Sequence, residues 1–314
     1  VYRNREGLCT DALLFLRGWK MMDYKLGDKV LIFYPEYYDY NLSWINRFYF
    51  LSGIKLFFFN SLSKETVEQL VREINSFKPD FITTFPSYLN DAAIIIKKEK
   101  LILEHIPKGI EVSGEILFDY QRKSCKEIFK TEIYDSYGSL ETGMIAHECK
   151  FHNGMHIYED IVYPESLNNN LIFTRTNLSE MPIIRYNIGD LGKVIYEKCK
   201  CGISGKKLTE VEGRIEDHIL LPDKTRIYPT SFRQILNSCN QKFDNSIAES
   251  NIIQGSKNNI TLNVVLSNNR HNKGIHDYLT NNVKKILQGK INLTIKFPNK
   301  IKRKLKFRFI ERKI

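Results

Sequence analysis

Short apolar runs alternate along the chain with longer stretches in which apolar side chains recur at helical spacing. Runs such as 30–34, 54–59 and 81–84 are rich in branched and aromatic residues and predict buried strands. Between them, Ser63 is a good N-cap for a helix that we expect to continue to Phe77. Because strands and helices alternate, the pattern predicts a mixed α/β architecture for the first part of the chain.

The spacing changes near residue 150, where short β segments follow one another. The β-rich subdomain that we expect there has strands at 154–158, 170–175, 181–186 and 192–197. Gly213 marks a boundary, which divides the chain into a large domain over 1–213 and a small, mobile α+β domain over 214–314. For the small domain the pattern predicts a hairpin at 222–223, a helix at 229–238, a strand at 259–266, a helix at 274–287 and a final strand in the basic tail.

The length and the charge of the chain indicate how many domains it has and what kind of partner it binds. A chain of 314 residues is long enough for two domains. No apolar run approaches the roughly 20 residues of a membrane-spanning helix, so we expect no membrane span and a cytoplasmic protein. The formal charge of +11 suggests an anionic partner, and much of the excess lies in 300–308. That run lacks the aromatic platform and fold signatures of nucleic-acid binders, so we expect no nucleic-acid partner. The oligomeric state stays open, with a homodimer as one candidate.

The six cysteines do not suggest a disulfide framework in a chain of this size. Cys9, Cys125 and Cys239 stand in helix-like surroundings, and we expect all three to be buried thiols.

The other cysteines stand in a pattern that can bind metal. Cys149 and His152 are separated by two residues, and Cys199 and Cys201 by one. Three thiolates and an imidazole would make a tetrahedral zinc site that joins two distant segments. His156 is an alternative ligand, and free thiols are an equally good interpretation.

Three polar motifs follow apolar runs in a fixed order. In the first, Tyr137 to Glu141, Gly138 allows the backbone to approach a flat ligand closely, and Glu141 can hold Mg²⁺ beside a triphosphate. In the second, Asp190 follows Gly189 at an expected tight turn, where a carboxylate can accept both hydrogen bonds of a ribose diol. Alone, each could be an ordinary turn.

The third motif, Gly213 to Asp217, lies at the predicted domain boundary. Arg214 can reach a ribose or phosphate there, and the acidic pair that begins at Glu216 suits an exposed hinge. A charged linker is an equally simple interpretation. Taken with the other two motifs, this one predicts a nucleotide site in which Glu141, Asp190 and Arg214 converge on one cleft.

Together these motifs resemble the adenylate-forming enzymes, in the phenylacetate–coenzyme A ligase-like and capsular polysaccharide synthesis-like branch. The likeness spans essentially the whole chain. It rests on Ser113-Gly114-Glu115, Tyr137 to Glu141, Glu148-Cys149, Arg185 to Asp190, Cys199 to Gly202 and Gly213-Arg214.

The resemblance implies ATP-dependent activation of a small carboxylic acid to an acyl-adenylate, followed by transfer to a thiol, in the first place coenzyme A. It implies that Glu141 binds Mg²⁺, that Asp190 and Arg214 hold the ribose or phosphate, and that Glu216 is the hinge. The residues that it places around the adenine and the rest of the nucleotide are Ser113, Gly114, Glu115, Asp135, Ser136, Tyr137 and Gly138. The residues that it places in the acyl pocket are Tyr34, Phe85, Pro86 and Gly138.

The family also has a late catalytic lysine, which aligns best with Lys306 and has Lys304 as its rival because the family's glycine is missing here. In the family a Ser/Thr/Gly-rich phosphate loop precedes a Val-Tyr-Arg-like segment, whereas this chain begins at Val1-Tyr2-Arg3. We therefore expect an N-terminally truncated chain. A catalytically inactive AMP-binding remnant or regulatory module is the alternative function.

Overall fold

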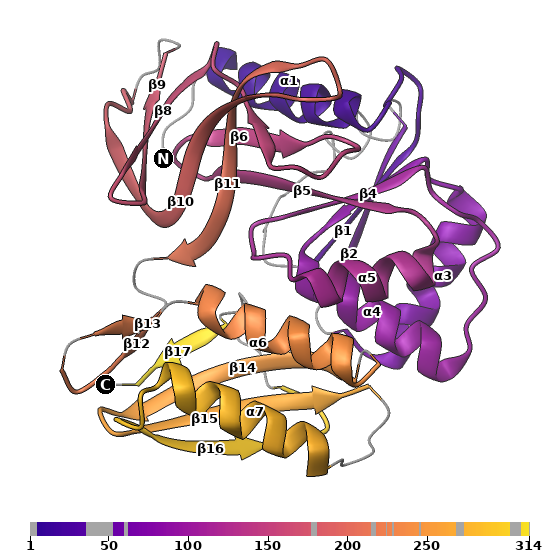
Figure 1. Cartoon of the computed structure of the whole chain (residues 1–314). Helices are drawn as coiled ribbons and strands as arrows, with labels where there is room; N and C mark the ends of the chain where they lie inside the picture. The colour runs from indigo at the N-terminus through magenta and orange to yellow at the C-terminus, as the bar shows by residue number, and fades with distance from the viewer. Residues whose placement is uncertain are drawn as a thin grey trace. The chain divides into compact units, whose positions relative to one another are not determined.

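The computed structural model of the chain describes residues 5–35, 53–59, 62–176, 181–214, 218–223, 225–227, 229–244, 246–267, 273–301 and 309–313. The chain forms two compact units (Figure 1). The first, the large unit, comprises residues 1–117 and 125–211, and the second, the small unit, comprises 118–124 and 212–314. The mixed α/β fold class predicted from the sequence is confirmed.

Eleven of the described strands form one sheet, in the order β2-β1-β3-β4-β5-β6-β7-β11-β10-β9-β8. Its first part is parallel, and its strands are β1 (Val30–Pro35), β2 (Ile54–Phe59), β3 (Phe81–Thr84), β4 (Gly109–Ser113) and β5 (Glu132–Ser139). Every residue of β3 is buried, as expected for a parallel strand that is covered on both faces. The apolar runs at 30–34, 54–59 and 81–84 correctly predicted β1, β2 and β3.

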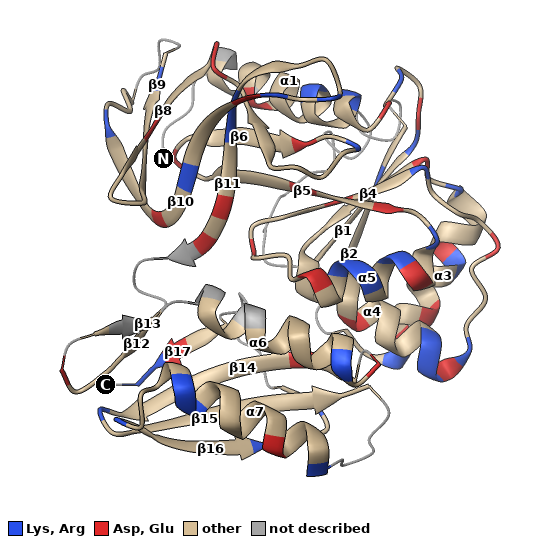
Figure 2. Cartoon of the chain, viewed as in Figure 1, with Lys and Arg blue, Asp and Glu red and all other residues tan. Residues whose placement is uncertain are grey.

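The helices of the large unit are α1 (Arg5–Met21), α3 (Lys64–Phe77) and α4 (Pro86–Glu99). The helix α5 (Asp119–Phe129) is shared, because residues 119–124 belong to the small unit and residues 125–129 to the large unit. α3 begins where the sequence predicts, because Ser63 Oγ accepts a hydrogen bond from the Thr66 amide at 3.3 Å. Its apolar face buries Val67, Leu70 and Ile74 in the core beside the parallel strands. Figure 2 shows both basic and acidic residues along α3, α4 and α5.

The second part of the sheet is mostly antiparallel, with β6 (Gly143–Glu148), β7 (Met155–Ile157), β8 (Val162–Leu167), β9 (Asn170–Arg175), β10 (Tyr186–Lys198) and β11 (Ser204–Arg214). The predicted strand at 181–186 is wrong, because β10 begins only at Tyr186. Pro182 lacks an amide donor for a ladder, and Arg185 adopts a left-handed φ of 46°. Gly189 and Asp190 form no tight turn either. They lie in a bulge of β10, where Gly189 has a φ of +81°.

The small unit contains β12 (Ile219–Leu220), β13 (Arg226–Ile227), α6 (Pro229–Lys242), β14 (Ile247–Ser256), β15 (Asn259–Leu266), α7 (Lys273–Ile286), β16 (Asn292–Lys296) and β17 (Ile310–Arg312). Its four-stranded sheet has the order β16-β15-β14-β17, and α6 and α7 pack together (Figure 1). α6 continues to Lys242, one turn beyond its predicted end. Most of the predicted final strand lies outside the described residues.

The cysteines of the helices differ in exposure. Cys125 and Cys239 are buried as predicted, whereas Cys9 is exposed because it lies on the outer face of α1. Within the described ranges, each helix is too short or too polar to cross a membrane.

Candidate functional site

A hydrogen bond joins the first two of the polar motifs. Tyr137 lies in β5 and Asp190 in the bulge of β10, and the tyrosine hydroxyl donates to Asp190 Oδ2 at 2.6 Å. Three strands stand between β5 and β10 in the sheet order, so a flat sheet would separate the two residues by roughly 19 Å. The Tyr137 ring also lies 6.1 Å from that of Phe173 in β9. The antiparallel part of the sheet therefore curls back toward β5.

The turn after Tyr137 holds two strands unusually close. A Cβ on Gly138 would lie 2.6 Å from the Gly143 carbonyl oxygen, so only glycine fits at this position. The Ser139 hydroxyl accepts the Thr142 amide at 3.1 Å and closes the turn. Glu141 lies within this turn, between β5 and β6, and is partly buried. Its carboxylate thus belongs to a well-defined loop next to Tyr137.

A second group of predicted residues meets at the ends of the parallel strands. The Tyr34 and Phe85 rings make an edge contact at 4.7 Å. Gly114 has a φ of +75°, and a Cβ there would come within 2.7 Å of the Phe85 ring. The Glu115 carboxylate accepts the amide of Ser87, the second residue of α4, at 3.1 Å. The carboxyl ends of parallel strands are where α/β proteins bind ligands.

The predicted adenine-framing residues of β5 make contacts inside the sheet. The Asp135 amide donates to Glu148 Oε2 at 2.9 Å, and the Ser136 hydroxyl donates to the Val112 carbonyl at 3.3 Å. Ser136 is buried, and Ser113 at the end of β4 stands beside it in the ladder. These two serines therefore link β4 and β5 close to Tyr137.

The remaining predicted site residues lie beyond what the structure describes. Glu216, Lys304 and Lys306 fall outside the described residues, as does the side chain of Arg214. The expected convergence of Glu141, Asp190 and Arg214 thus stays a prediction.

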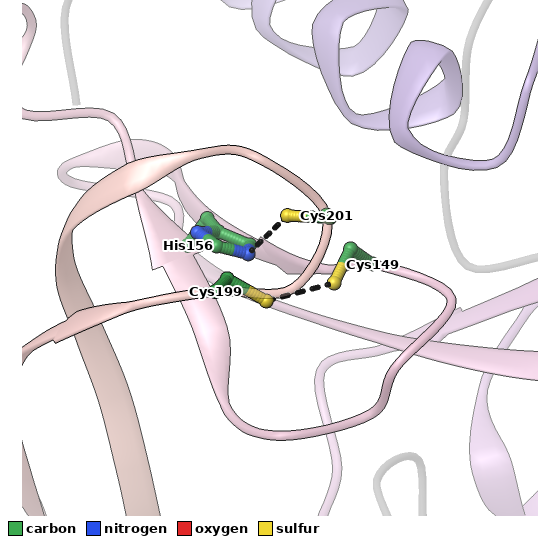
Figure 3. A group of neighbouring side chains, drawn as sticks. All are labelled: Cys149, His156, Cys199 and Cys201. Atoms are coloured by element: carbon green, nitrogen blue, oxygen red, sulfur yellow. Dashed lines mark hydrogen bonds between the residues drawn. The ribbon is translucent and has the colours of Figure 1, made fainter.

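Four side chains from two distant segments make a second cluster (Figure 3). The potential ligand atoms of Cys149, His156, Cys199 and Cys201 all lie within 4.8 Å of one another. The Sγ atoms of Cys149 and Cys199 are 3.7 Å apart, and Cys201 Sγ is 3.3 Å from His156 Nε2. Cys149 directly follows β6 and His156 lies in β7, while the other two thiols belong to the turn between β10 and β11.

His152 is not part of this cluster, which corrects the first choice of histidine from the sequence. Its Nδ1 lies 2.9 Å from a Glu148 carboxylate oxygen and its Nε2 lies 3.4 Å from the Glu132 carboxylate. His152 has a left-handed φ of 48° in the turn after Cys149, and this turn directs its ring toward the two glutamates. His156, the alternative ligand, takes the place instead.

The electrostatics of the cluster favour metal ligation. Burial, and then the neighbouring Lys207, lower the pKa of His156, so the imidazole is neutral at pH 7 and keeps a lone pair for a metal. Burial raises the pKa of Cys149 to about 12. A divalent cation would therefore displace a proton from this thiol as it binds. Three sulfur ligands and one nitrogen ligand suit Zn²⁺ in a closed, structural site.

A buried polar network that no sequence motif indicates fixes α1 to the sheet. Trp19 Nε1 donates to Glu111 Oε2 at 2.8 Å, and Glu111 Oε1 lies 2.5 Å from His147 Nε2. His147 Nδ1 in turn lies 2.7 Å from the Tyr158 hydroxyl. Burial would raise the pKa of Glu111, but His147 and the Trp19 hydrogen bond hold it below its ordinary value. The sequence around Glu111 and around His147 shows only the pattern of a buried strand. The hydrogen bond between the two side chains becomes apparent only in the folded structure.

The chain resembles known acid–coenzyme A ligases. It is 30% identical over 190 residues to the phenylacetate-coenzyme A ligase of Thermus thermophilus, an alignment that covers 54% of this chain and 41% of that protein. It is 23% identical over 256 residues to the protein CapK of Staphylococcus aureus, covering 76% and 53% of the two chains. No protein-family profile matches.

Solved structures share the fold. A 2-hydroxyisobutyryl-CoA ligase in the postadenylation state superposes with a TM-score of 0.76 at 20% identity, covering 96% of this chain and 69% of that one. An anthranilate CoA ligase in complex with anthranoyl-AMP superposes with a TM-score of 0.60 at 11% identity, covering 93% and 60%. The chain spans about two fifths to one half of the length of the curated relatives that it matches.

Proposed function

We propose, from the chain's relationship to the phenylacetate–coenzyme A ligase-like and CapK-like branch of the adenylate-forming enzymes, that it carries part of an AMP-forming acid–thiol ligase. The observation that supports this most directly is the 2.6 Å hydrogen bond between Tyr137 and Asp190. It brings two of the motifs that carry the resemblance to one place, although 53 residues separate them in the sequence.

The reaction proceeds in two steps. A carboxylate oxygen of the acid attacks the α-phosphorus of ATP, the bond to pyrophosphate breaks, and an acyl-adenylate forms. A thiol, which we take to be that of coenzyme A, then attacks the acyl carbon and AMP leaves. Negative charge spreads over the phosphate oxygens in the first step, so fixed cations and hydrogen-bond donors do most of the catalysis.

The described residues have distinct roles in this proposal. The Asp190 carboxylate accepts the ribose hydroxyls, and the Tyr137 hydroxyl orients it by donating to one of its oxygens. Glu141 would hold Mg²⁺, which neutralises charge on the phosphates, since this ion prefers hard oxygen ligands shared with phosphate. Ser113, Gly114, Glu115, Asp135, Ser136 and Gly138 frame the nucleotide.

The acid binds at the ends of the parallel strands, against Tyr34, Phe85 and Pro86. The contacts between Tyr34, Phe85 and Gly114 support this place for an apolar acyl group. Arg214 and Lys306 act on the phosphates, and Glu216 is the hinge between domains over 1–213 and 214–314. A cytoplasmic location remains a prediction from the sequence, and fractionation tests it.

The test is a screen of carboxylic acids for ATP-dependent release of pyrophosphate, with Asp190→Ala as the matched variant. We expect release with at least one acid, and ATP binding by the Asp190→Ala variant that is about tenfold weaker by calorimetry, because the ribose loses a charged acceptor worth roughly 1.5 kcal/mol. Nucleotide binding without any pyrophosphate release would favour the inactive AMP-binding module. An unchanged ATP affinity in the variant would refute the ribose role of Asp190.

The cluster of Cys149, His156, Cys199 and Cys201 supports a further part of the proposal, a structural Zn²⁺. The ion would join the segment that connects β6 and β7 to the turn between β10 and β11. Because β10 also carries Asp190, the metal would stabilise the curled part of the sheet near the nucleotide. Metal analysis of the purified protein should give about one zinc per chain; a value near zero with free thiols would remove the site.

A further inference from the structure

Lys207 is a buried lysine beside the thiol and imidazole cluster. It lies in β11, and its side chain has a relative exposure of 0%. In the antiparallel ladder of β11 and β7 it stands directly opposite His156. A lysine is almost never fully buried unless its charge is paired. The partners of this ammonium group therefore indicate what it does.

A carboxylate and a thiol lie beside Lys207. Its Nζ donates to Glu197 Oε2 at 3.1 Å, and the Cys199 thiol lies near enough for its charge to interact with the ammonium group. The Glu197 side chain is 44% exposed, so water stabilises that carboxylate even without the lysine. The thiol of Cys199, in contrast, is buried in the cluster. The buried ammonium group is therefore more important to the sulfur than to the carboxylate.

The net charge of a bound zinc centre explains why a positive group is needed next to the cluster. Three thiolates, one neutral imidazole and one Zn²⁺ carry a net charge of −1. A buried net charge without a compensating partner costs several kcal/mol. Lys207 supplies the opposite charge at the cluster, whereas Glu197 adds a second negative charge close by.

We propose that Lys207 is a positioning residue of the metal centre, one that balances the charge of the bound centre and thereby raises its affinity for zinc. The proposal rests on the zinc site proposed above. It predicts that the two partners of one ion pair act in opposite directions. Lys207 should favour metal binding, and Glu197 should oppose it or have no effect.

The experiment compares zinc dissociation constants, measured by competition with a chromogenic chelator. We expect Lys207→Met to bind zinc 10- to 100-fold more weakly, the usual range for residues that support metal ligands. Lys207→Arg, which keeps the charge, should recover most of the affinity. Lys206→Met is the matched control. The Lys206 side chain points to the other face of β11, where its Nζ lies 4.3 Å from the centre of the Tyr163 ring, so this substitution should leave zinc binding unchanged.

Glu197→Gln separates this role from that of an ordinary ion pair. The charge proposal predicts zinc affinity equal to or higher than that of the wild type in this variant, and it can be tested even if Lys207→Met does not fold. Equal weakening by Glu197→Gln and Lys207→Met would overturn the proposal, as would wild-type affinity in Lys207→Met. With Co²⁺ as a probe, the thiolate-to-cobalt absorption should change in Lys207→Met and not in Lys206→Met. A wild-type chain that binds no zinc would instead refute the zinc site itself.

Discussion

At the scale of single residues, the network of Trp19, Glu111, His147 and Tyr158 is the clearest constraint on the large unit. All four side chains are buried, and each hydrogen-bonds to at least one of the others. Gly18 makes the arrangement possible, because a Cβ at this position would lie 2.2 Å from the His147 ring. α1 can therefore approach β6 closely only at a residue without a side chain.

Gly18→Ala tests this close approach. An alanine within a helix normally stabilises it, but here the new methyl group must displace a buried ring, and overpacking of this kind costs about 1–3 kcal/mol. We expect urea unfolding to show a loss in that range. Gly255→Ala, whose new Cβ would meet no atom within 4 Å, is the control and should stay within about 0.5 kcal/mol of the wild type. A neutral Gly18→Ala would mean that α1 is not held against His147.

Glu111 should make the stability of the large unit depend on acid. Its pKa is held below the ordinary value of 4.5, so its contribution is fully present above that pH and is lost as the pH falls below it. Glu111→Gln lacks this carboxylate and should show a weaker loss of the free energy of unfolding between pH 6 and pH 3, although it is less stable at pH 7. Urea unfolding at several pH values measures both effects. Identical slopes in the two proteins would contradict the shift.

At the scale of elements, the pairing of strands decides which side chains meet. His147, His156 and Lys207 stand opposite one another across β6, β7 and β11. Because side chains alternate between the two faces of a strand, a shift of one residue would exchange Lys207 for Lys206. Local spacing suggested His152 as a ligand, whereas the register of β7 presents His156 to the thiols.

Removal of zinc should loosen the two segments that the cluster joins. At free zinc 100 times above the dissociation constant, the metal adds about 2.7 kcal/mol, so chelation should lower the Tm of the large unit by roughly 5–10 °C. Hydrogen exchange should rise at 149–156 and 199–203. Cys199→Ser should remove the response to chelator, while the exposed Cys9→Ser should keep it. A Tm that is indifferent to zinc would argue against a structural metal.

At the scale of the whole molecule, the chain contains a large unit with most of the described site residues and a small unit whose last basic segment carries the expected catalytic lysine. A lysine about 4 Å from the reacting phosphate contributes roughly 4 kcal/mol at an effective dielectric near 20. Such a residue would act in adenylation and not in the later attack by the thiol. The two half-reactions should therefore respond differently to its loss.

Lys306→Ala is expected to slow adenylation by about two to three decades, measured as ATP–pyrophosphate exchange. Transfer to the thiol from supplied acyl-adenylate should remain close to that of the wild type. Lys304→Ala is the matched control, since this lysine is two positions away. Normal exchange in Lys306→Ala with a loss in Lys304→Ala would reassign the role, and normal exchange in both variants would remove it from this segment.

Much of the fold followed from local patterns. Ser63 and the apolar face after it located α3, and the buried runs located β1 to β3, because cap chemistry and burial act over a few neighbouring residues. The strand expected at 181–186 failed where Pro182 and Arg185 interrupt the ladder. The four-residue extension of α6 also escaped prediction, since fraying and tertiary contacts set the ends of helices.

The sequence alone was sufficient to identify the motifs around Tyr137, Asp190 and the cysteines. The residue type determines which chemical groups a side chain carries, whatever the fold. The tertiary structure alone decided which of these groups meet. The curl of the sheet brings the Tyr137 hydroxyl to Asp190, and strand register selects His156 over His152 and buries Lys207 instead of Lys206. Such contacts depend on which strands pair and in which register. Strands that are distant in sequence form these pairs, so no local pattern specifies them.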